Sequence, residues 1–140
     1  KDMNDIKTAI DKIETKVMLS ILWIFLTLNY IFCDVFSLMY HEDLQQLLSG
    51  HVGDMEISQK FLLSFAIIME IPMAMIVLSR LLKYNLNRLA NIAAGSVLTI
   101  VQFGSLFADS NTLHYLFFSA IEISTSSFII WVSLKWKVCT

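Results

Sequence analysis

Three carboxylic acids lie inside long apolar stretches of this 140-residue sequence. Asp34 falls in YIFCDVFSLM, Glu70 in IIMEIPMAMIV and Glu122 in YLFFSAIEI. An acid in such a stretch is costly to bury and marks a candidate for cation binding, proton relay or general acid–base chemistry. The chemistry that this sequence could perform therefore centres on these three side chains.

The stretches that carry the acids belong to four apolar blocks, each long enough to cross a membrane. The sequence is 56% hydrophobic and has only four Gly and one Pro. About 17–25 helical residues cross the hydrocarbon, and backbone groups in lipid must be satisfied within the segment, which favours helices here. A soluble bundle would need a water-facing side on each helix, and none of the four blocks has a face rich in Lys or Glu. We therefore predict an all-α integral membrane four-helix bundle in one domain, 17–137, with spans 17–40, 61–82, 89–108 and 113–134.

The basic residues predict the orientation of these spans. If the chain crosses four times, Lys60 alone lies on one side. All the other basic residues lie on the opposite side: Lys1, Lys7, Lys12, Lys16, Arg80, Lys83, Arg88, Lys135 and Lys137. The basic side of a membrane protein is cytoplasmic, so we expect both termini in the cytoplasm. No basic patch with interleaved aromatic residues occurs, so no nucleic-acid partner is expected.

Residues 1–16 predict a short amphipathic N-terminal helix. Met3, Ile6, Ile10, Ile13 and Val17 follow one another at steps of three and four, which places them on one helical stripe. Such a helix could lie on the membrane surface, extend the first span, or pair with a second copy as a short coiled coil. Its lysines are balanced by acids, so strong attraction to anionic lipid is not expected.

Helical spacing gathers the polar residues of each span onto one face. These faces would be penalised in lipid, so we expect all four to turn inward. The candidate ligand-binding residues that this arrangement brings together are Asp34, Glu70, Glu122, Gln102, Tyr30 and Ser119. Pro72 frees the carbonyl of Ile68, so a kink with spare acceptors is expected beside Glu70.

Three carboxyl groups at one level of a low-dielectric interior, with no cation among them, cannot all be ionised at modest cost. Either at least one is protonated, or a bound cation supplies the missing charge, or water fills an outer cavity. A plainer alternative is that Glu70 and Glu122 only hydrogen-bond between helices and specify packing. The histidines share no metal-ligand spacing, and no nucleotide loop, Ser-His-Asp pattern or CxxC occurs, so neither a metal site nor a cofactor is predicted.

These observations lead to three hypotheses. The first is an outward-facing carboxylate pocket that binds or transports a cationic or amphiphilic small molecule, with protonation as a switch. Four helices leave little room for a transport path, so a transporter is expected to be a homodimer or larger. The second is an intramembrane enzyme that uses paired Glu and Asp as general acid and base on a lipid-like substrate. The third is a structural subunit of a membrane complex.

Four segments carry a resemblance to known proteins: YIFCDVFSLM, MEIPMAMIVLSR (69–80), NRLANI (87–92) and YLFFSAIEI. In these segments the chain resembles a family of four-helix bacterial membrane proteins of unknown function and, more loosely, DoxX-like proteins. The likeness covers about 22–137. It implies a multi-pass protein of the bacterial inner membrane in contact with membrane lipid, and it implies no particular activity.

Overall fold

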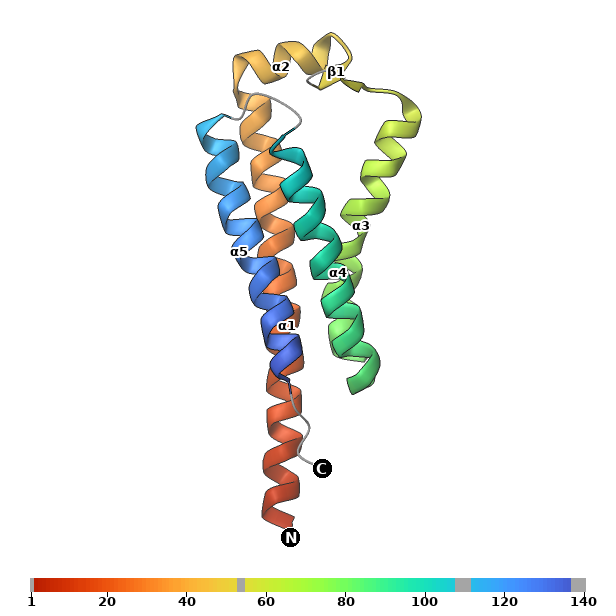
Figure 1. Ribbon diagram of the computed structural model, residues 1–140, viewed down its shortest axis with the longest axis vertical. Helices are drawn as coiled ribbons and strands as arrows, with labels where there is room; N and C mark the ends of the chain where they lie inside the picture. Colours follow the sequence, from red (N-terminus) through yellow and green to blue (C-terminus); the bar gives the residue numbers. More distant parts are fainter. Residues whose placement is uncertain (1, 53–54, 108–111, 137–140) are drawn as a thin grey trace.

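The computed structural model describes residues 2–52, 55–107 and 112–136, and nearly all of them are helical. The helices are α1 (Asp2–Met39), α2 (His41–Leu48), α3 (Gln59–Leu81), α4 (Tyr84–Ser105) and α5 (Leu113–Lys135) (Figure 1). Between α2 and α3, the two-residue strands β1 (His51–Val52) and β2 (Met55–Glu56) pair antiparallel. The predicted all-α class is confirmed.

Three of the described helices are long and apolar enough to cross a membrane. They are Ile13–Met39 of α1, Gln59–Leu81 (α3) and Leu113–Lys135 (α5). Among the described helices, α4 has a comparable length but does not meet the same test, because polar residues such as Asn87, Asn91 and Gln102 occupy its buried face. By length and composition, three of the four predicted spans are therefore membrane-length helices.

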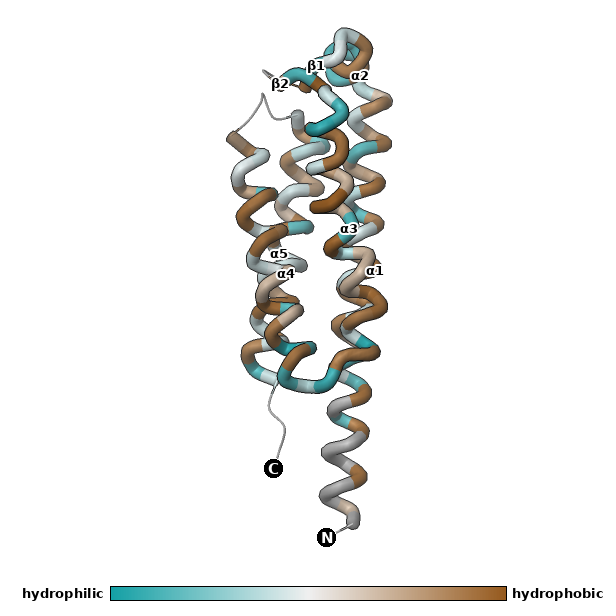
Figure 2. The backbone as a smooth tube through the Cα atoms, turned by 90° about the vertical axis from the view of Figure 1, so that its right-hand side faces the viewer, coloured by the Kyte–Doolittle hydropathy of each residue, from teal (hydrophilic) through white to brown (hydrophobic). Residues whose placement is uncertain are grey.

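The long helices form two neighbouring pairs. Helix α1 packs along α3, and α4 packs along α5; α1 also contacts α5, and α3 contacts α4. Figure 2 shows the two pairs side by side. In Figure 1, α3 diverges from α5 toward the end of the bundle where α2 crosses from α1. The two ends of the molecule therefore differ: one is tightly packed, and the other is spread apart beneath α2.

The apolar core lies where the pairs meet. Leu19, Trp23 and Leu26 of α1 are fully buried. They belong to a cluster that also contains Tyr30, Met75, Ala94, Leu98, Ile129, Val132 and Trp136. Helices α4 and α5 approach closely at Gly95, where an added Cβ would lie 2.9 Å from Cγ1 of Ile130.

A buried polar network joins α1, α3 and α4 near the tightly packed end. The Asn91 amide donates to Oδ1 of Asn87 at 2.6 Å, and the Asn87 amide donates to the carbonyl of Ser79 at 2.6 Å. Trp23 Nε1 donates to Asn91 Oδ1, also at 2.6 Å. Since buried polar groups are costly unless bonded, these contacts position three helices relative to one another.

The predicted N-terminal segment, residues 1–16, is not a separate helix in the part that the structure describes. Helix α1 continues without a break from Asp2 through the first membrane-length stretch. Figure 1 shows its first turns projecting beyond the ends of the other helices. Residues 2–16 thus extend the first span, an arrangement in which their apolar stripe remains available to a second copy.

Candidate functional site

The central feature of the site is the buried acid Glu122 on α5. Its side chain is 1% exposed, and its Oε1 atom has no hydrogen-bond partner among the described residues. It lies nine residues after Leu113, or about 14 Å along the helix from the end next to α2. A buried polar atom without a partner costs free energy, so its retention needs an explanation.

Helix α1 supplies three titratable groups that interact with Glu122. Tyr30, Cys33 and Asp34 all lie close enough to the Glu122 carboxyl group to interact with it electrostatically. Tyr30 and Cys33 are buried, whereas Asp34 is exposed at the surface of the single chain. The two acids therefore differ in setting, one inside the helix packing and one at its edge.

Helices α4 and α5 add a chain of hydrogen bonds beside this pair. Gln102 Nε2 donates to Ser119 Oγ at 2.8 Å, and Ser119 lies one turn before Glu122 on α5. The Ser105 hydroxyl donates to the Gln102 carbonyl at 2.7 Å, and the Tyr115 hydroxyl donates to Ser105 Oγ at 2.6 Å. These groups satisfy one another, which leaves Glu122 Oε1 unpartnered among them.

Two basic side chains, Lys16 and Arg88, bond to backbone carbonyls at the end of the bundle opposite α2. Lys16 donates to the Leu82 carbonyl at 2.6 Å, and Arg88 donates to the Ser133 carbonyl at 3.0 Å. Within the described residues, Glu122 has no ion pair, and the salt bridge recorded there joins His114 to Asp43 at 4.0 Å near α2. None of the ion pairs among the described residues therefore neutralises Glu122.

Glu70 does not join the site. It is exposed on α3, whose buried residues are Pro72, Met75 and Ser79. The expectation that three acids converge is wrong in this respect, because α3 packs on α1 and α4 and turns its proline face inward. Its apolar residues surround the helix almost evenly, so hydropathy alone did not indicate which face is buried.

The other predicted site residues lie together on α1, α4 and α5. Asp34 and Tyr30 interact electrostatically with Glu122, and Gln102 donates a hydrogen bond to Ser119. Sequence reasoning did not include Tyr115 or Cys33 in the site, although Tyr115 also interacts electrostatically with Glu122. Tyr115 precedes Glu122 by seven residues and Cys33 follows Tyr30 by three. Residues at these separations lie on the same face of a helix, so the spacing in the sequence already placed both residues on the faces that form the site.

The side chains around Glu122 combine acidic and aromatic groups. The described residues hold no group of three His, Cys, Asp or Glu side chains able to bind a metal. Glu122 and Asp34 offer negative charge, and the tyrosine rings offer aromatic faces that attract cations. Both features suit a weakly hydrated organic cation.

Membrane-length helices packed around a buried acid define the class: an all-α protein with the features of a membrane protein. The chain matches the model of a family of unknown function, DUF6326, over residues 9–140, and it belongs to that family. A search of curated proteins and a search of solved structures each found no match. Any assignment of function therefore depends on the site itself.

Proposed function

We propose that the chain crosses a bacterial inner membrane four times, through α1, α3, α4 and α5, with both termini in the cytoplasm. Helix α4 lies alongside α3 and α5, and the links on either side of it are short, so these three helices run antiparallel. The polar side chains of α4 form hydrogen bonds inside the bundle. Such a helix can therefore cross a membrane with a lower mean hydropathy than a span that faces lipid on all sides. The loose likeness to DoxX-like proteins is consistent with this topology.

We infer that the site binds or transports a cationic or amphiphilic small molecule, with Glu122 as its buried anion and Asp34 as a second acid at the edge. The observation that supports this function best is the buried, unpartnered oxygen of Glu122. A purely structural acid would be expected to form a hydrogen bond between helices. A bound cation, or a proton exchanged for it, supplies the interaction that the described residues lack.

The test is binding of tetraphenylphosphonium to the protein in lipid nanodiscs, measured at pH 6 and pH 8. We expect saturable binding to the unaltered chain, at least a tenfold loss of affinity in Glu122→Gln, and weaker binding at pH 6, where protons compete. Glu70→Gln is the matched control, because that acid is exposed on α3, and it should bind normally. Absence of saturable binding, or equal affinities for the two variants, would overturn the proposal.

The unlike settings of Asp34 and Glu122 also support a second candidate, an enzyme that uses the two acids as base and acid on a lipid-like substrate. One carboxyl group is exposed and the other buried, which is the condition under which paired acids divide these roles. Turnover of an extracted lipid by the unaltered chain, with Asp34→Asn and Glu122→Gln both inactive, would favour it. Cation binding without turnover would exclude it.

A further inference from the structure

The surface of α1 that faces away from the bundle carries an unbroken apolar stripe. In the projecting turns it consists of Met3, Ile6, Ile10 and Ile13, and Met3 is 84% exposed and Ile13 62% exposed. Beyond Val17 the same face continues at steps of three and four with exposed Ile21, Ile24, Leu28, Ile31, Val35 and Leu38. The stripe therefore runs from the projecting end through the membrane-length part of the helix.

Membrane lipid can cover the apolar side chains in the membrane-length part of this stripe. The apolar side chains in the projecting turns need a different partner. Steps of three and four that leave only one narrow seam apolar are typical of a coiled coil, whereas a helix lying in a membrane surface has a wider apolar face. The remaining positions in residues 2–16 carry acids and lysines in nearly equal number. Attraction to anionic lipid is correspondingly weak.

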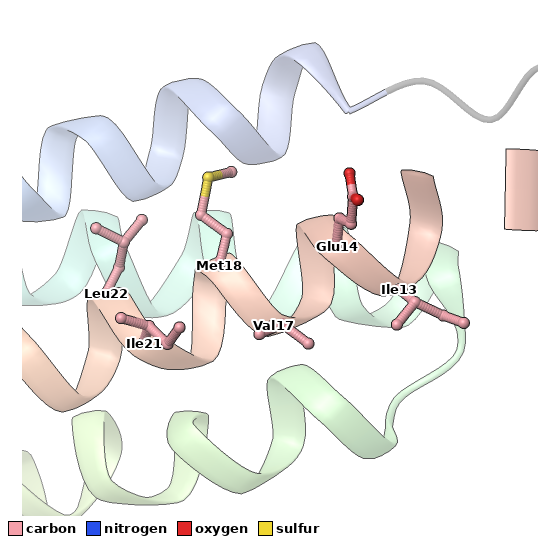
Figure 3. A pocket seen from close by; sticks show the side chains of 6 residues that line it. All are labelled: Ile13, Glu14, Val17, Met18, Ile21 and Leu22. Atoms are coloured by element: carbon pink, nitrogen blue, oxygen red, sulfur yellow. The ribbon is translucent and has the colours of Figure 1, made fainter. Parts of the chain in front are cut away.

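A groove where the projecting turns join the bundle has the form of a helix-packing surface. It has a volume of about 360 Å³. Its walls are two rows of side chains on α1, each at steps of four: Ile13, Val17 and Ile21 in one row, and Glu14, Met18 and Leu22 in the other (Figure 3). Ridges of a second helix pack into grooves between such rows.

We propose that the outward face of α1 is the interface of a parallel homodimer, in which α1 of a second copy lies along the stripe. Two copies inserted in the same direction place the same stretch of α1 opposite itself, so the seam is self-complementary. Two heptads alone make a marginal coiled coil. The membrane-length part of α1 raises the effective concentration of the partner segment.

The first experiment is cysteine cross-linking in native membranes. Ile10→Cys should form a disulfide-linked dimer on mild oxidation, because position 10 lies in the seam. Asp11→Cys is the matched control: it is equally far along the helix and exposed, but turned by about 100°, and it should stay monomeric. Equal cross-linking of both variants, or of neither, would overturn the proposal.

The second experiment is light scattering of the purified protein in detergent. We expect a protein mass twice the chain's 16.0 kDa for the unaltered protein, and 16.0 kDa when Ile6 and Ile10 are both changed to Asp. Both side chains are exposed, so the change should leave the bundle folded, which circular dichroism checks. A single-chain mass for the unaltered protein, or a dimer that survives the two changes, would contradict the homodimer. Maleimide labelling of Ile10→Cys tests membrane lipid as the occupant: a thiol that is protected in liposomes but reacts freely in detergent would also contradict the homodimer.

Discussion

Trp23 on α1 and Asn91 on α4 are joined by a buried hydrogen bond of 2.6 Å from the indole nitrogen to the amide oxygen. Asn91 also donates to Asn87 on its own helix and accepts from the Ser79 hydroxyl of α3, so one amide connects three partners inside the bundle. Such a network specifies the relative position of the helices as well as contributing to stability.

Asn91→Ala should lower the free energy of unfolding by about 2–3 kcal/mol, because it leaves the Trp23 indole N–H buried without its acceptor. Asn85→Ala on the same helix is the control, since Asn85 is exposed, and its effect should stay within about 0.5 kcal/mol. Unfolding in mixed detergent micelles measures both. Similar losses for the two variants would show that the network contributes little.

Gly95→Ala should destabilise the packing of α4 on α5 by about 1–3 kcal/mol, because the new methyl group would meet Ile130 at 2.9 Å. Gly104→Ala lies on the same helix with no atom of the described residues within 4 Å of the added group. It should be neutral or stabilising, because alanine favours helix by about 1 kcal/mol. Thermal unfolding of the two variants should therefore change in opposite directions or differ clearly in size.

Glu122→Met should raise the free energy of unfolding by about 1–3 kcal/mol, because it removes a buried oxygen that has no partner among the described residues. Ser119→Ala provides the contrast: it removes the acceptor of the Gln102 amide and should lower stability by about 1 kcal/mol. Detergent-titration unfolding measures both. Destabilisation by Glu122→Met would instead assign Glu122 a packing role.

Arg88→Met should loosen the last turn of α5, because Arg88 donates to the carbonyls of Ser133 and Leu134. Hydrogen exchange of the amides in the last turn should accelerate on the order of tenfold, the equivalent of a lost charge-assisted bond. Lys83→Met changes an exposed cation of the adjoining loop and should leave these amides unaffected. Unchanged exchange in Arg88→Met would mean that the turn is held by other contacts.

Helical periodicity was sufficient to predict which face of α4 and α5 points inward. On α4 the buried residues include Asn91, Gly95 and Gln102, and on α5 they include Ser119 and Glu122. Polar and small residues stand out clearly against apolar neighbours, so their common face can be read from spacing. The same reasoning failed for α3, where Glu70 is exposed and Pro72 is buried.

The sequence by itself determined the helices and the acids that interrupt them, because helical hydrogen bonds are local and apolar length is a property of each segment. Only the tertiary structure decided which acids meet. Asp34 lies within electrostatic range of Glu122 because α1 packs on α5, while Glu70 stays outside because α3 packs on α1 and α4 through its other face. That choice depends on the fit of side chains between helices, which no single segment contains.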